Sequence, residues 1–234
     1  MLRTVLASAA VALLGWLSAS WLTEGFDVFT AEGARRRAVA TVPVPAPHAT
    51  LLGTGIKVIN GVNGVNGVNG VKGVNGPDNV SGESLHSLLA DSGRVTIVSF
   101  IYTRCPSVCK ALGSSFQQLQ AAVSAPTSGS GIQLLSISFD PAHDDMAQLH
   151  RYATLWRADP RHWHVAAVPD AAQLQALLKA WQVVVIPDGL GGFEHNAALL
   201  VVDAGGRLVR IFDDSDSGAA LAFARSLLQA THPG

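Results

Sequence analysis

Residues 95–109 read VTIVSFIYTRCPSVC, an apolar run that leads into two cysteines separated by three residues. The part from Val95 to Tyr102 is mostly β-branched or aromatic, which is typical of a buried strand. Beyond Cys105, apolar side chains recur every three or four residues and predict a helix. The helical stripe consists of Val108, Leu112, Phe116, Leu119 and Val123. The cysteines are therefore expected where a buried strand ends and a helix begins.

The same kind of pattern continues towards the C-terminus. Apolar runs predict strands at 132–139, 165–168, 197–202 and 208–212. Helical stripes occupy 146–156, 174–181 and 221–228. Asp144 or Asp145 can cap the first of these helices, and Asp170 with Gln173 forms a capping pair for the second. The order β-α-β-α-β-α-β-β-α predicts an α/β protein with a thioredoxin-like fold and one extra βα insertion.

The composition limits the class of protein. The chain has 234 residues, which is enough for one domain with tails. Lys and Arg number 16 against 17 Asp and Glu, and no basic stripe runs through the folded part, so nucleic acid is not an expected partner. The two cysteines lie close together, and such a pair more often serves redox or metal chemistry than general cross-linking.

The N-terminus has the features of an anchoring or targeting segment. Arg3 precedes an uncharged apolar stretch from Val5 to Leu22, and two tryptophans lie near its outer end. We expect residues 1–22 to form an N-terminal transmembrane anchor. A cleaved signal segment is the alternative, with a weak small-residue cleavage site at Ser18-Ala19-Ser20.

Two segments of biased composition precede the globular part. Residues 23–57 are expected to be a membrane-proximal linker, whose alternating prolines at 43–47 favour extended polyproline geometry. Residues 58–77 carry an Asn-Gly-Val repeat, in which lone valines cannot build a core. We interpret the repeat as a flexible, expanded loop or linker. The thioredoxin-like domain is expected at 78–231.

The positions of Cys105 and Cys109 suit both metal binding and thiol redox chemistry. Side chains four residues apart on a helix face the same way. Backbone N–H groups and the helix dipole favour thiolates at the start of a helix. Soft thiolate ligands select Cu(I), and they also accept zinc. The two cysteines could equally close a redox-active disulfide, since Cα atoms at this spacing lie about 6 Å apart.

Three segments occur in a recognisable order: YTRCPSVC at 102–109, SFDPAHD at 138–144 and EHN at 194–196. Together they resemble the Sco/SenC family, whose members are copper chaperones for the Cu(A) centre of cytochrome c oxidase. The resemblance covers roughly 83–229. It implies a domain that is held at the inner (cytoplasmic) membrane and faces the periplasm.

The resemblance also implies a ligand set. The two motif cysteines and the histidine of the family map to Cys105, Cys109 and His195, which would bind copper as Cu(I) or Cu(II). From the residues alone, His195 is supported by the glycine-containing loop before it, which lies beside the cysteine turn in a thioredoxin-like fold. The family usually has an acidic residue at the position of Ser107 and Asp at the position of Glu194. These departures remove no ligand.

Other polar residues near the motifs need separate interpretation. His143 is a distant rival to His195 as a ligand. His162 and His164 flank a tryptophan at a predicted strand start and are expected to be structural. Asp144 is interpreted as a helix cap, whereas Asp140 could either cap a helix or orient a ligand.

Three functions are compatible with these features. The first is a copper-binding metallochaperone that delivers copper to the oxidase subunit carrying Cu(A). The alternative is an extracytoplasmic thiol–disulfide oxidoreductase that reduces acceptor cysteines before metallation. The partners could also include other copper chaperones or a thioredoxin-like reductant. The spacing favours the first, because dedicated oxidoreductases of this fold have two residues between the cysteines. A peroxidase-like enzyme that uses Thr103 and Arg104 beside Cys105 is the third.

Overall fold

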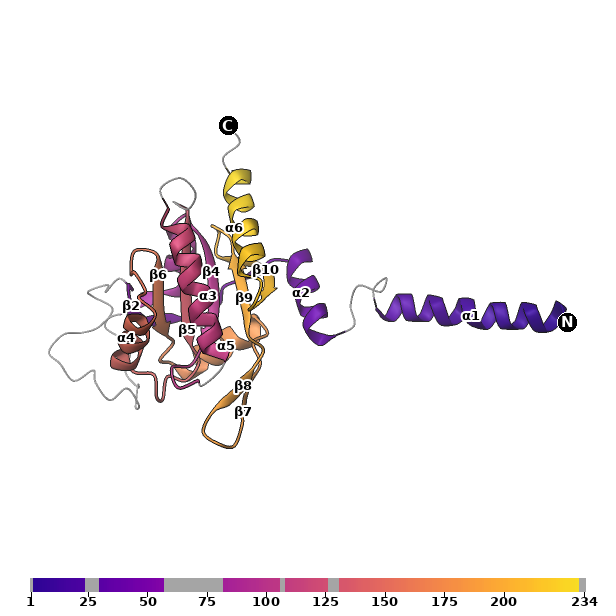
Figure 1. The fold of residues 1–234 in the computed structure, drawn as a ribbon, viewed down its shortest axis with the longest axis horizontal. Helices are drawn as coiled ribbons and strands as arrows, with labels where there is room; N and C mark the ends of the chain where they lie inside the picture. The colour runs from indigo at the N-terminus through magenta and orange to yellow at the C-terminus, as the bar shows by residue number, and fades with distance from the viewer. Residues whose placement is uncertain (1, 24–29, 57–81, 106–107, 126–130, 232–234) are drawn as a thin grey trace.

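A mixed β-sheet forms the centre of the molecule. The computed structural model describes residues 2–23, 30–56, 82–105, 108–125 and 131–231, so the repeat expected at 58–77 lies outside the described residues. In the described part, eight strands form one sheet (Figure 1). From edge to edge they are β1 (Val44–Pro45), β10 (Arg207–Asp213), β9 (Ala198–Val202), β4 (Val95–Ile101), β5 (Ile132–Ser138), β6 (Trp163–Ala167), β2 (Thr50–Thr54) and β3 (Glu83–Ser84).

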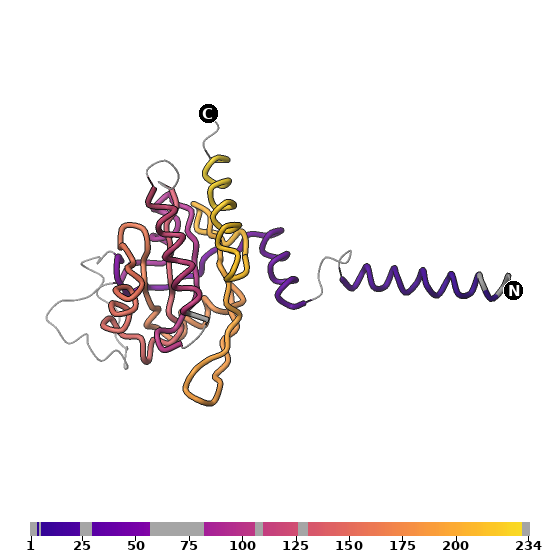
Figure 2. Tube along the Cα trace, viewed as in Figure 1, coloured from indigo at the N-terminus to yellow at the C-terminus, as the bar shows by residue number. Residues whose placement is uncertain are grey.

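The four middle strands are buried along their whole length. β4, β5 and β6 run parallel, and β9 pairs with β4 in the antiparallel sense. Every residue of these four strands is buried, as the continuous apolar runs predict for strands covered on both faces. A second, two-stranded sheet is a hairpin of β7 (Val185–Pro187) and β8 (Phe193–His195). Figure 2 traces this hairpin as an orange loop that projects beyond the main sheet.

Helices cover both faces of the sheet. The helices of the described residues are α1 (Leu2–Leu22), which takes no part in this cover, α2 (Ala31–Thr41), η1 (Ser87–Asp91), α3 (Val108–Val123), α4 (Met146–Leu155), α5 (Ala171–Ala180) and α6 (Ser217–Thr231). Phe116 of α3 contacts Trp163. Trp163 pairs with Leu134, which pairs with Ile97, so these strand residues point to the same face of the sheet. Trp181, directly after α5, contacts Phe100. Ile97 and Phe100 are an odd number of residues apart and point to opposite faces, so α3 and α5 lie on opposite sides.

Two predicted helix starts can be checked in detail. The Asp145 carboxylate accepts from Gln148 N at 2.8 Å and caps α4, so of the two neighbouring aspartates it is the second that caps. The Asp170 carboxylate accepts from Gln173 N at 2.8 Å and caps α5, as predicted. The Gln173 side chain, however, accepts from Thr50 N at 2.8 Å and ties α5 to β2. The capping pair therefore forms in only one direction.

The segment expected to be a linker at 23–57 differs from that expectation. It contains α2, β1 and β2, and both strands belong to the main sheet. Thr30 caps α2 by accepting from Gly33 N at 2.9 Å. Val39 and Leu51 are fully buried against the core. These two residues bury apolar area that a free linker would expose, which stabilises the packed arrangement.

The N-terminal helix α1 lies apart from the sheet in Figure 1. Its apolar side chains are exposed, among them Leu6, Val11, Leu14 and Trp21. Within the described residues, no helix combines the length and the apolar character needed to cross a membrane.

Candidate metal centre

The cysteine turn lies at the carboxyl end of β4, where β5 also ends. Parallel neighbouring strands deliver their following loops to the same edge of a sheet, so residues 102–105 and 139–145 lie side by side. Cys105 is buried, and its backbone N donates to Tyr102 O at 3.2 Å. α3 begins at Val108, which places the backbone of Cys109 in its first turn, as predicted. Residues 106 and 107 and the side chain of Cys109 lie outside the described part.

Asp144 holds the residues that precede Cys105. Its buried carboxylate accepts from Thr103 N at 2.9 Å, from Thr103 Oγ1 at 2.6 Å and from Ser138 Oγ at 2.5 Å. The interpretation of Asp144 as a helix cap is therefore wrong, because Asp145 supplies the cap and Asp144 bonds the cysteine turn instead. This carboxylate fixes the turn relative to the end of β5.

Asp140 forms a second link between the two loops. Its buried carboxylate accepts from Arg104 Nη2 at 2.8 Å and lies 2.8 Å from His143 Nδ1. The hydrogen bond to Asp140 raises the pKa of Arg104. Asp140 thus acts as an ion-pair partner for the residue next to Cys105 and not as a helix cap. His143 is held through Nδ1, and more than half of its side chain is exposed.

His195 reaches the cysteine turn through a cluster of aromatic rings. Its ring lies against Phe139, with 5.0 Å between the ring centroids. Phe139 in turn contacts Tyr102 and Phe193, at 5.3 and 5.5 Å. The Tyr102 hydroxyl donates to Phe193 O at 3.4 Å and accepts from Phe193 N at 3.3 Å. The strand that carries His195 is therefore tied to the start of the cysteine turn.

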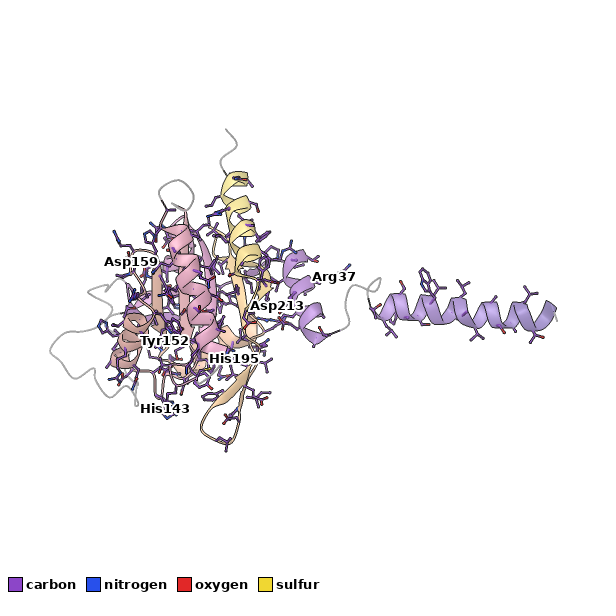
Figure 3. All side chains as sticks on the ribbon, in the orientation of Figure 1. Arg37, His143, Tyr152, Asp159, His195 and Asp213 are labelled. Carbon is purple, nitrogen blue, oxygen red and sulfur yellow. The ribbon has the colours of Figure 1, made fainter. Side chains whose placement is uncertain are left out.

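The surroundings of His195 favour a neutral imidazole. Burial lowers the pKa of His195, and the charge of Asp214 opposes that shift only in part. A neutral ring is the form that binds a metal ion, because protonation removes the lone pair. Figure 3 shows His195 where the β7–β8 hairpin joins the rest of the domain. His195 also lines a cavity of about 470 Å³ between α2 and the hairpin.

The structure brings the expected ligands to one end of the domain but describes only part of the set. Among the described residues, no three His, Cys, Asp or Glu side chains lie close enough together to hold a metal ion. The thiol of Cys109, the third expected ligand, falls outside that search. His164 is structural, as predicted: it is buried, and its Nδ1 lies 2.9 Å from Gly55 O.

Sequence reasoning assigned no role to Tyr102, Phe139 or Asn196. Tyr102 lies in the motif at 102–109, and Phe139 lies in the motif at 138–144. Their place in these motifs was the available signal that both aromatic rings lie beside the cysteine turn. The Asn196 side chain, just after β8, bonds the backbone of Gln182 and Val184, just before β7. No local pattern marks that role, because the hairpin itself was interpreted as a loop.

The fold is that of a thioredoxin-like α/β protein, and the cysteine turn and the strand of His195 meet at one end of it. The family described as SCO1/SenC matches residues 86–227, which is more than half of the chain. The chain therefore belongs to the SCO1/SenC family.

Known proteins agree with that assignment. The chain is 24% identical over 137 residues to a SCO1 protein homolog of Bacillus subtilis (strain 168), covering 58% of this chain and 67% of that protein. It is 31% identical over 120 residues, half of its length, to a Stutzerimonas stutzeri protein whose name describes copper binding, and it spans only 56% of that relative. The crystal structure of yeast Sco1 with copper bound has a TM-score of 0.57 at 16% identity, covering 82% of this chain and 92% of that one.

Proposed function

We propose that this protein binds copper through Cys105, Cys109 and His195 and delivers it to the Cu(A) site during cytochrome c oxidase assembly. The observation that carries the proposal is the aromatic cluster that joins the cysteine turn to the strand of His195. Related proteins support it: the structure of yeast Sco1 is known with copper bound, and BsSco is a member of the Sco family of cytochrome c oxidase assembly proteins. Copper is the cargo in this proposal.

Delivery requires that the site release copper as well as bind it. Thiolates at the start of α3 would hold Cu(I) strongly, because soft sulfur ligands suit that ion. The imidazole comes from a hairpin that is not part of the main sheet. Such a ligand can leave without disturbing the core, which opens one coordination position to an acceptor's ligands.

Replacing His195 by alanine is expected to change the Cu(II) spectrum of the reduced protein and to weaken Cu(II) binding. The reason is that the nitrogen ligand is lost while both sulfur ligands remain. Visible absorption and electron paramagnetic resonance of the copper-loaded variant measure the change. His143→Ala is the matched control, since it removes an exposed imidazole from the neighbouring loop. A spectrum that changes in the His143 variant and not in the His195 variant would assign the ligand to His143.

A thiol–disulfide oxidoreductase that reduces acceptor cysteines is the second candidate. The position of Cys109 in the first turn of α3 favours it, because the start of a helix stabilises a thiolate. A disulfide switch has also been identified in the related protein BsSco. Reduction of an oxidised acceptor dithiol by the wild type and by His195→Ala separates the candidates. A reductase needs no imidazole and keeps its rate, whereas copper delivery requires it. A thioredoxin-like reductant and other copper chaperones are proposed as further partners.

We also propose that residues 1–22 hold the domain at the inner membrane, facing the periplasm. The exposed apolar side chains of α1 support attachment to lipid, and one related structure is that of a SCO1/SenC family lipoprotein from Bacillus anthracis. Fractionation of cells that express the full chain, or a chain lacking residues 1–22, tests this. The full chain is expected with the membranes and the truncated chain in the soluble fraction. Equal distribution of the two would contradict the proposal.

A further inference from the structure

The cavity beside His195 has two walls that come from distant parts of the sequence. One wall is the hairpin side, with Ile186, His195 and Asn196. The other wall is the first turns of α2, with Glu32 and Arg35. The helix that follows the N-terminal segment therefore stands directly opposite the expected copper ligand.

Arg35 fixes α2 to the chain segment that enters the hairpin. Its Nε and Nη2 atoms donate to Trp181 O at 3.2 and 2.9 Å. Trp181 follows the last residue of α5, where helix carbonyls lack partners within the helix and attract a cation. Arg35 is only 5% exposed, and Glu32 pairs with it at 2.9 Å. A buried charge with these partners has little freedom to move.

Asn196 closes the base of the hairpin next to His195. Its Oδ1 accepts from Val184 N at 2.7 Å, and its Nδ2 donates to Gln182 O at 3.1 Å. The same Nδ2 donates to Glu32 Oε2 at 3.4 Å. Glu32 thus contacts both Arg35 and the residue adjacent to His195.

α2 is itself held in place by a third contact. Arg36 pairs with Asp213 at the end of β10 through Nη1 at 2.7 Å and Nη2 at 2.5 Å. Arg36 also donates to Glu32 at 3.1 Å. α2 therefore connects the main sheet, through Glu32, to the separate hairpin that carries His195.

We propose that Glu32 and Asn196 position His195, so that α2 sets the geometry of the copper site from outside it. This inference rests on the proposed function and adds two positioning residues to it. A group that orients a metal ligand, without contacting the metal, typically changes metal affinity by about 10–100-fold. Because Glu32 acts through a long hydrogen bond, its effect should lie at the lower end of that range.

A double-mutant cycle on the full chain tests the inference. Cu(II) affinity is measured for the wild type, Glu32→Ala, His195→Ala and the double variant. Glu32→Ala is expected to lower affinity about 10-fold when His195 is present and to have no further effect when His195 is absent. Glu32→Gln is the conservative control: it retains an oxygen that can accept from Asn196, so it should keep most of the affinity. Equal losses with and without His195 would overturn the inference.

A second measurement does not depend on copper. Hydrogen exchange of the metal-free protein is expected to speed up across residues 182–196 in Glu32→Ala, while the amides of β4 and β5 stay protected. If the wild type binds no copper, the proposed function fails. The contact of Glu32 with the hairpin is still tested by the hydrogen exchange of residues 182–196. Unchanged exchange at 182–196 would refute it.

Discussion

Replacing Cys105 by serine is expected to lower copper affinity by at least about 100-fold, because losing a metal ligand costs more than losing a group that only orients one. A hydroxyl is a hard ligand and does not substitute for a thiolate on Cu(I). Cys109→Ser should have the same effect, since the two thiolates form one clamp. Competition with a Cu(I) chelator of known affinity measures the loss.

Lys110→Ser is the matched control for the Cys105 variant. Lys110 is exposed in the first turn of α3, next to Cys109, so its replacement changes a neighbouring residue and keeps all three expected ligands. Its copper affinity should equal that of the wild type. Circular dichroism would show that all three variants keep the fold. A Cys105→Ser protein that competes for Cu(I) as well as the wild type would rule out the copper clamp.

The main elements of the fold follow from short-range pattern. The run from Val95 to Tyr102 predicted β4 to within a residue, and the stripe from Val108 to Val123 predicted α3 with its observed bounds. These elements are predictable because burial on both faces, or along one helical stripe, leaves a mark in consecutive residues. The runs at 197–202 and 208–212 likewise predicted β9 and β10. In the turn between them, Asp203 accepts from Gly205 N, and Gly206 has a φ of +74°, which a glycine adopts without strain.

The elements that escaped prediction are held by distant partners. β2 pairs with β6, so Leu52 lies opposite Ala167, far along the chain. β7 and β8 have three residues each, and residues such as Ile186 stay largely exposed. Strands this short leave no periodic signal. Their position depends on contacts such as the hydrogen bond from Thr50 N to Gln173, which no local rule predicts.

The site residues, like the elements of the fold, fall into those that local sequence predicted and those that it did not. The cysteine pair could be found from sequence because both members lie in one short motif, with Cys105 three residues before α3 and Cys109 in its first turn. His195 lies on a separate hairpin, and only resemblance to a family singled it out among eight histidines. The role of Asp144 was assigned wrongly because Asp144 and Asp145 both precede a helix. Only their hydrogen-bond partners in the structure show that Asp145 caps the helix and that Asp144 bonds the cysteine turn.

Asp144→Ala is expected to lower the free energy of unfolding of the reduced, metal-free protein by about 3 kcal/mol. The substitution leaves the buried Ser138 Oγ and the half-buried Thr103 N without their carboxylate, and each unsatisfied buried donor costs about 1–3 kcal/mol. Urea unfolding followed by circular dichroism measures the change. Asp144→Asn should lose less, because its amide oxygen can still accept one of these hydrogen bonds.

Asp145→Ala is the control that separates the two neighbouring carboxylates. It removes the cap of α4, which should cost only about 1 kcal/mol, and it leaves the cysteine turn bonded. Copper affinity should therefore fall in Asp144→Ala and stay unchanged in Asp145→Ala, because Thr103 lies two residues before Cys105. Equal losses of stability and of affinity in the two variants would mean that the turn is held by its own backbone and not by Asp144. In that case the link between β5 and the cysteine turn would have no part in preparing the site for copper.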